Sequence, residues 1–250
     1  MMMRVAAAVV LVEWGSALQL APQQAALRES RVPLRATTQH RAEAIVSGHL
    51  DEAALAARWA AHGIAYVESF LAPESFAELE SLALNYLPEL SPETDNGVAR
   101  GRLGTFVDGG EAFAQLLTST AVRDCLKRIT RSSTLAPSDF PVELRRYPRH
   151  SRMDWHTDEM LYSEPQVECV FTVLNTSDSE TQWVEDNGLV VSQSTRPNSL
   201  LLVRAEGPRH RVTPVTKGDR VIAKFVYTDS PFKLDAWYAN LDAYRPPQRR

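Results

Sequence analysis

The residues with the clearest chemical potential lie in the stretch MDWHTDE, residues 153 to 159. His156 and Asp158 are two positions apart, so an extended backbone would project both side chains to the same side. An imidazole and a carboxylate placed in this way can form an acid/base pair or supply two ligands of a metal site. They can also lie together by coincidence on a polar loop, because this short spacing alone is a weak signal.

A metal site needs a third ligand, and His210 is the natural candidate. It opens the segment HRVTPVTKGDR, which predicts a strand, a turn at Lys217 and Gly218, and a returning strand. Two histidines and one carboxylate form the facial triad of non-haem Fe(II) oxygenases. The returning strand carries Arg220, whose planar guanidinium suits a carboxylate and could hold an acidic co-substrate beside the metal.

These segments resemble the Fe(II)/2-oxoglutarate-dependent dioxygenase superfamily, and within it the prolyl 4-hydroxylase-like branch. The resemblance covers roughly residues 62 to 228. The matching segments are HGIAYVESFLAPESFAELESLA, LRRYPRHSRMDWHTD, SETQW, RPNSLLLV and HRVTPVTKGDR. Asp178 and Ser179 replace the two glycines that the family has before Glu180, and the basic residue is Arg220 rather than lysine. These departures leave the substrate class open.

The resemblance implies that His156, Asp158 and His210 bind Fe(II), and that Arg220 and the hydroxyl of Tyr147 bind 2-oxoglutarate as a co-substrate. It implies a reaction in which O2 is the second co-substrate, a C–H bond is hydroxylated, and succinate and CO2 are released. A peptidyl proline is the first substrate to consider, and a small molecule is the next. Family chemistry also implies ascorbate as a cofactor.

Two other classes stay open. The chain could be a non-catalytic jelly-roll binding module, or a cupin-type metalloenzyme that does not use 2-oxoglutarate. The complete set of His156, Asp158, His210 and Arg220 favours the dioxygenase over the binding module. Arg220 also favours it over the cupin-type enzyme, which needs no carboxylate clamp.

The elements that must position these residues follow from the hydrophobic pattern. Helical spacing appears within 42–62, 73–87 and 119–129, with a short strand within 64–71. From about residue 140 the pattern changes to seven short strands, separated by turn segments that include SRMD, residues 151–154. This order predicts an α+β fold, with a double-stranded β-helix (jelly-roll, cupin-like) core at about 140–228 and the N-terminal helices packed on one sheet.

We expect three regions along the chain: a targeting leader or disordered tail at 1–40, the dioxygenase domain at 41–235, and a C-terminal tail at 236–250. The stretch MMMRVAAAVVLV is similar to a signal-peptide core, and residues 18–41 hold four arginines against one acid. This order resembles the two-part leaders that direct proteins to plastids. Secretory entry through the endoplasmic reticulum or a cytoplasmic location are the alternatives.

The amino-acid composition limits the classes of molecule that this protein is expected to bind. The net charge of −4 lacks the basic footprint of a nucleic-acid-binding protein. The chain has two cysteines outside any CxxC pair, which excludes a thiolate zinc site and favours two buried free thiols over a disulfide. No apolar run reaches the length of a membrane span. The expected partner is therefore a peptide, protein or small-molecule substrate, and the sequence says nothing of the oligomeric state.

Overall fold

The structure, a computed structural model, describes residues 45–94 and 97–241 of the 250-residue chain. The chain divides into two units, Met1–Ala36 and Thr37–Arg250, and every described residue lies in the second. The predicted leader at 1–40 lies outside the described residues, so import into a plastid stays a prediction. Within 45–94 and 97–241, no helix has the length and apolar character needed to cross a bilayer.

Helices precede most of the strands, as the pattern predicted. The helices are α1 (Glu52–His62), α2 (Pro73–Tyr86), the 3-10 turn η2 (Leu87–Glu89), α3 (Ala112–Leu117), α4 (Thr120–Thr130) and α5 (Asp235–Asn240). The first strands are β1 (Ile64–Val67), β2 (Ser91–Pro92), β3 (Ala99–Arg100), β4 (Leu103–Val107) and β5 (Ala136–Pro137). The later strands are β6 (Val142–Tyr147), β7 (Arg152–His156), β8 (Val167–Asn175), β9 (Thr181–Val184), β10 (Val190–Gln193), β11 (Ser199–Arg204), β12 (His210–Val212) and β13 (Arg220–Thr228).

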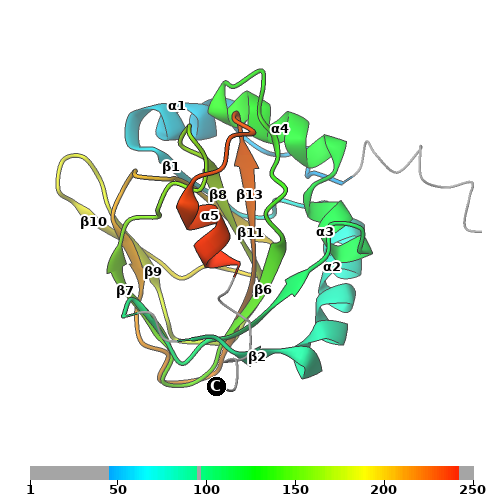
Figure 1. The fold of residues 1–250 in the computed structure, drawn as a ribbon, viewed down its shortest axis with the longest axis vertical. Coiled ribbons are helices and arrows are strands. Elements are labelled where there is room, and N and C mark those ends of the chain that lie inside the picture. Colours follow the sequence, from blue (N-terminus) through cyan, green and yellow to red (C-terminus); the bar gives the residue numbers. More distant parts are fainter. Residues whose placement is uncertain (1–44, 95–96, 242–250) are drawn as a thin grey trace, which may run out of the picture. The chain divides into compact units, whose positions relative to one another are not determined.

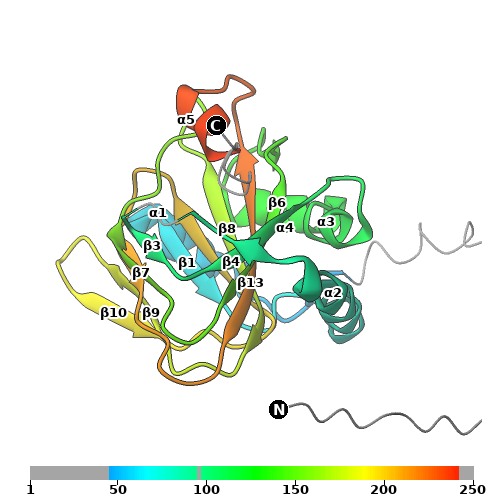
Figure 2. The same ribbon diagram turned by 60° about the horizontal axis from the view of Figure 1, so that its bottom comes forward.

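The strands form two antiparallel sheets. The larger sheet has the order β1-β11-β8-β13-β6-β4-β2, with β5 paired to β13, and the smaller has the order β10-β9-β12-β7-β3. Figures 1 and 2 show the strands of the smaller sheet on one side of β6, β8 and β13, and helices α2 and α3 on the other. The predicted α+β class is confirmed.

Each central strand of the larger sheet has an apolar face and a mixed face. On β13, Val221, Ala223 and Phe225 belong to the main hydrophobic core, together with buried residues of α1, α2, α3 and α4. The alternate residue Ile222 packs instead with Tyr147 and other residues between the two sheets. Because side chains alternate along a strand, the helices bury one face and leave the other to line the space between the sheets.

Two segments differ from the sequence interpretation. The stretch SRMD was expected to be a turn, but Arg152, Met153 and Asp154 belong to β7, which pairs with β12 and β3. Partners distant in the sequence supply the backbone hydrogen bonds of β7, which local residue preferences do not reveal. The predicted tail from residue 236 begins inside α5, where Trp237 is buried against Phe140 at a ring distance of 5.9 Å.

Both cysteines are buried free thiols, as the composition favoured. Cys125 lies on α4 and Cys169 on the helix-facing side of β8, and both belong to the main core. Burial raises the pKa of the Cys125 thiol to about 12 and raises that of Cys169 well above its ordinary value. Both sulfurs therefore act as small apolar groups of the core.

The packing of α2 on the sheet predicts a matched pair of substitutions. Leu79 is 0% exposed, whereas Leu84 on the same helix is 49% exposed. Leu79→Ala should lower the free energy of unfolding by about 2–5 kcal/mol, because it leaves a cavity in the core. Leu84→Ala should change it by no more than about 0.5 kcal/mol. Urea denaturation followed by circular dichroism measures both, and similar losses would contradict this packing.

Candidate metal centre and the cavities beside it

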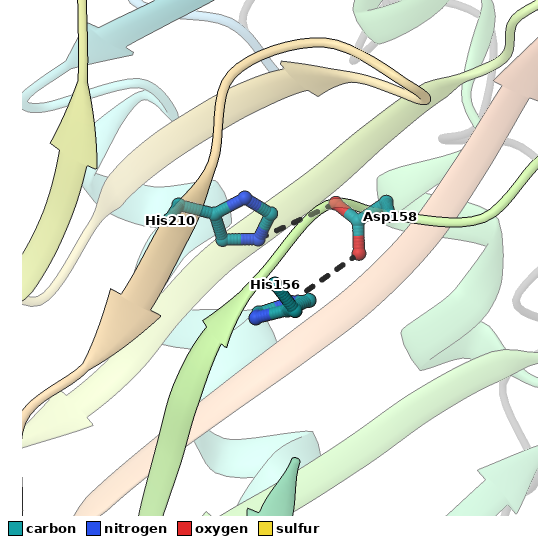
Figure 3. A group of neighbouring side chains, drawn as sticks. All are labelled: His156, Asp158 and His210. Atoms are coloured by element: carbon teal, nitrogen blue, oxygen red, sulfur yellow. Dashed lines mark ion pairs between the residues drawn. The ribbon is translucent and has the colours of Figure 1, made fainter. Parts of the chain in front are cut away.

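Two histidines face each other across neighbouring strands. His156 ends β7, His210 begins β12, and the register of the two strands sets them directly opposite. Asp158 follows β7 by two residues, and its carboxylate lies beside both rings (Figure 3). Its Oδ1 is 3.7 Å from Nε2 of His156, and its Oδ2 is 3.4 Å from Nε2 of His210. The structure thus brings together the three side chains that the sequence suggested as metal ligands.

Backbone carbonyls orient both imidazoles. Nδ1 of His156 lies 2.9 Å from the carbonyl oxygen of Asp154, and Nδ1 of His210 lies 3.1 Å from that of Pro208. A carbonyl oxygen only accepts, so each Nδ1 carries the proton and each Nε2 presents a lone pair toward the centre. Nε2 of His156 is buried and has no hydrogen-bond partner among the described residues, as expected of an atom held for a metal.

Local electrostatics favour the protonation states that metal ligands need. Burial lowers the pKa of His210, although the charge of Asp158 opposes this shift. Burial alone would raise the pKa of Asp158, but the neighbouring side chains of His210, His156 and Lys224 together hold it below its ordinary value. The ligand atoms of the three residues lie within 4.8 Å of one another. Two nitrogens and a carboxylate in this arrangement fit a divalent transition metal.

Arg220 is a buried cation beside this cluster. It begins β13, and only 1% of its surface is exposed. Its Nη1 donates to Oγ1 of Thr181 at 2.8 Å, whereas its buried Nε has no hydrogen-bond partner in the described part of the chain. No ion pair joins it to a described carboxylate. Burial lowers the pKa of Arg220, but a guanidinium stays charged at neutral pH, so the pocket holds a positive charge that a bound anion would balance.

The turn before β13 sets the direction of Arg220. Gly218 has a φ of +63°, and a Cβ there would lie 2.2 Å from the carbonyl oxygen of Thr176, so the position requires glycine. Asp178 accepts hydrogen bonds from the backbone N–H groups of Thr216 and Lys217 at 2.8 and 3.0 Å. Asp178, which stands where the family that the sequence resembles has a glycine, therefore stabilises the turn that leads to Arg220.

Tyr147 lies next to Arg220 but does not hydrogen bond to it. The two residues are cross-strand partners on β6 and β13, and the guanidinium carbon is 5.9 Å from the centroid of the tyrosine ring. The tyrosine hydroxyl accepts a hydrogen bond of 3.1 Å from Nη1 of Arg102. Tyr147, Thr181 and Arg220 line a cavity of about 40 Å³ together with the three candidate metal ligands.

A second, larger cavity shares His156 and Asp158 with the small one. Its volume is about 500 Å³, and its charged lining residues other than Asp158 are Glu93, Arg102, Arg145, Glu159, Glu168 and Lys224. Residues 93, 94, 98 and 102 line this cavity, whereas its lining includes no residue of 175–188.

Sequence reasoning did not assign Lys224 to the site, although its side chain lines both cavities. Residues 220, 222 and 224 share one face of β13, so the inward position of Arg220 already implied an inward Lys224. The same alternation places Arg145 beside Tyr147 on the inner face of β6. Counting every second residue along β13 from Arg220, and along β6 from Tyr147, would have identified Lys224 and Arg145.

No protein-family model matches this sequence, and no curated protein matches it. Several solved structures do share its fold. A prolyl-4-hydroxylase from Pseudomonas putida superposes with a TM-score of 0.59 at 18% identity, covering 70% of this chain and 97% of that one. A prolyl hydroxylase from Trichoplax adhaerens, in complex with a peptide fragment of the hypoxia inducible factor oxygen degradation domain, gives a TM-score of 0.60 at 16% identity, covering 71% and 89%.

A third similar structure is the epimerase SnoN in complex with Fe3+, alpha-ketoglutarate and a nogalamycin compound. It gives a TM-score of 0.63 at 16% identity and covers 80% of this chain and 92% of that one. At these identities the likeness concerns the fold. The chain therefore has the fold of 2-oxoglutarate–Fe(II) oxygenases, prolyl hydroxylases among them, which is the fold that the sequence resemblance implied.

The convergence of the three side chains predicts a metal site that depends on His210. His210→Ala should weaken Mn(II) binding by more than about 100-fold, since the loss of even an outer hydrogen-bond partner of a ligand commonly weakens binding 10–100-fold. Isothermal titration calorimetry with Mn(II), which resists air oxidation better than Fe(II), measures the affinity. His49→Ala removes an exposed histidine far from the cluster in sequence and should bind like the wild type. An unchanged affinity in His210→Ala would exclude this centre.

Proposed function

We propose that this protein is an Fe(II)- and 2-oxoglutarate-dependent dioxygenase that hydroxylates a C–H bond. In this reaction the substrate, O2 and 2-oxoglutarate give the hydroxylated product, succinate and CO2. The shared fold, the cluster of His156, Asp158 and His210, and the buried cation beside it support the proposal. The two facing antiparallel sheets also support a double-stranded β-helix as the core of the domain.

The geometry supports a role for each residue of the site. Nε2 of His156, Nε2 of His210 and the carboxylate of Asp158 would hold Fe(II) and leave further coordination positions open. Bound Fe(II) with 2-oxoglutarate would supply the activation of O2 that oxidises a C–H bond. The protein's own residues lower the pKa of His210, keep Asp158 ionised and present the three ligand atoms close together. The carbonyls of Asp154 and Pro208 fix the orientation of the two rings.

The observation that carries the proposal is the unpaired charge of Arg220. A buried guanidinium whose described partner is one hydroxyl group would strongly favour a bound anion. The small cavity joins this cation to the candidate metal ligands. 2-Oxoglutarate matches both ends of the cavity, because one carboxylate and the oxo group can reach the metal while the other carboxylate pairs with Arg220. A cupin-type enzyme without 2-oxoglutarate would have no use for this cation.

Hydroxyl groups would complete the pocket for the far carboxylate. Thr181 already contacts Arg220, and it occupies a position that sequence reasoning did not assign. Tyr147 stays a proposed contributor, with its hydroxyl oriented by Arg102. The similar structures include a prolyl hydroxylase with a peptide and an epimerase with a small molecule. Both a peptidyl proline and a small molecule are therefore open substrate classes at this stage, and ascorbate stays a proposed cofactor.

A direct test is the formation of succinate. Purified protein with Fe(II), 2-oxoglutarate and O2 should release succinate slowly even without substrate, because some turnover is uncoupled from hydroxylation. His156→Ala should reduce the release to background, since it removes a metal ligand. Succinate is measured by mass spectrometry. A wild-type rate no higher than that of the variant would rule out 2-oxoglutarate turnover and leave the binding module and the cupin-type enzyme as the alternatives.

Arg220→Ala tests the carboxylate clamp separately from the metal. Loss of one partner of a desolvated charge pair costs about 2–5 kcal/mol, so 2-oxoglutarate should bind roughly 30-fold to several thousand-fold more weakly. The affinity for Mn(II) should stay near that of the wild type. Arg196→Ala, at an arginine whose side chain is 75% exposed, is the matched control. Parallel losses of metal and 2-oxoglutarate affinity in Arg220→Ala would contradict the assigned role.

A further inference from the structure

The larger cavity carries an unusual number of buried charges on one wall. We name this the charged wall, and its members are Glu93, Arg102, Glu143, Arg145, Glu168 and Lys224. All but Lys224 are buried, and Lys224 keeps only 16% of its side chain exposed. Every member except Glu143 lines the larger cavity, which also exposes His156 and Asp158. The wall therefore lies where a substrate would meet the candidate metal.

The members of the charged wall form one continuous chain of ion pairs. Lys224 lies 3.1 Å from Glu168 and 3.7 Å from Glu143. Arg145 continues the chain, 2.5 Å from Glu143 and 3.7 Å from Glu93. Arg102 closes it by pairing with Glu93. Three cations thus alternate with three acids, and the wall as a whole is close to neutral.

These charges are costly to bury. An apolar set of similar volume is often as stable as a buried ion-pair network, or more stable, so the pairs are a weak explanation for stability alone. Burial alone would lower the pKa of Lys224. The negative charges of Glu168 and Glu143 have the larger combined effect and raise this pKa above its ordinary value, so the ammonium stays charged. A charged wall of this kind is expected where a ligand must be recognised by its own charges.

Three buried atoms of the wall form no hydrogen bond with the described residues, and one of them, Oε2 of Glu168, is in an ion pair with Nζ of Lys224 at 3.1 Å. The other two lack a partner that a ligand could supply. Oε2 of Glu93 and Nε of Arg102 are buried, and neither has a hydrogen-bond partner within residues 45–94 and 97–241. One is an acceptor and the other a donor. Because Glu93 and Arg102 already pair with each other, the two atoms belong to adjacent groups. A ligand with an anionic acceptor and a cationic donor close together would complement both the hydrogen-bonding capacity and the charge of this pair.

We infer that the larger cavity binds a free amino acid as the substrate, with its carboxylate toward Arg102 and its ammonium toward Glu93. This inference rests on the proposed dioxygenase function and specifies its substrate class. An amino acid joins its two charges through one carbon, which matches the adjacent cation and acid. A proline inside a peptide has no charge at that place, and it would desolvate the ion pairs without replacing their lost hydration.

The size of the cavity agrees with a small substrate. A volume of about 500 Å³ lies within the range of small-molecule sites. Lys224 and Glu168 line the same cavity and would meet a polar side chain of the amino acid. His156 and Asp158 line it as well, so the side chain would lie within the cavity that adjoins the candidate metal site.

The test uses the complete chain with Fe(II) and 2-oxoglutarate. Each of the twenty free L-amino acids is added separately, beside its N-acetyl, C-amide form and a proline-rich peptide. At least one free amino acid should raise the succinate rate above the basal rate and yield a hydroxylated product by mass spectrometry. Its blocked form should not, because blocking removes both charges. Basal succinate with no response to any free amino acid overturns this inference alone, as does an equal response to the blocked form or a response to the peptide only.

The proposed function fails in a different way. If the wild type releases no succinate beyond His156→Ala under any condition, both the dioxygenase function and this inference are overturned. Basal turnover therefore separates the two outcomes.

A pair of variants tests the assigned contact. Glu93→Gln should raise the KM for the responding amino acid about 10-fold or more, because it removes a charge-assisted hydrogen bond, while the KM for 2-oxoglutarate should change far less. Glu185→Gln removes the acid of a surface ion pair with Arg58 and should leave both values unchanged. Equal KM changes for the two substrates in Glu93→Gln, or none, would contradict the contact. If Glu93→Gln does not fold, the comparison of free and blocked amino acids in the wild type still decides the inference.

Discussion

The register between β7 and β12 is the constraint on which the site depends. It sets His210 opposite His156, and a slip of one residue would turn one of the two side chains to the other face of the sheet. The same register lets a carboxylate two residues beyond the strand end lie between both rings. Backbone carbonyls then orient the imidazoles, so no additional side chain is needed to direct the two Nε2 atoms. The centre is thus largely a product of strand pairing.

The larger sheet solves a second problem, which is to carry many charges without losing its stability. Its helix-facing side buries the apolar residues of β13, β8 and β11 in one continuous core. Its other side carries Arg220, Lys224, Glu143, Arg145 and Glu168. Because alternate residues of one strand serve the two sides, the core can hold the backbone of these strands in place while their charged residues face the cavities. Stability and recognition are therefore assigned to opposite faces of the same strands.

Much of this arrangement could be read from the sequence. The strands rich in Val, Ile and Leu lie where the period-two pattern put them, and the spacing of His156, Asp158, His210 and Arg220 pointed to one site. Other parts depend on pairings between distant segments. β7 was obscured by the turn-like residues SRMD, and Glu93 and Arg102 lie among short strands that no local pattern marks. The position of Lys224 was within reach, because strand alternation from Arg220 specifies it. The ion-pair partners of the charged wall could not be predicted in this way, since they come from five different strands or loops.

The two buried thiols have a practical consequence for work on this chain. Neither sulfur forms a cross-link, and both are shielded within the helix-covered core. Folding stability thus does not depend on an oxidising environment. Reducing agents that keep iron ferrous can be present throughout purification and turnover without unfolding the protein.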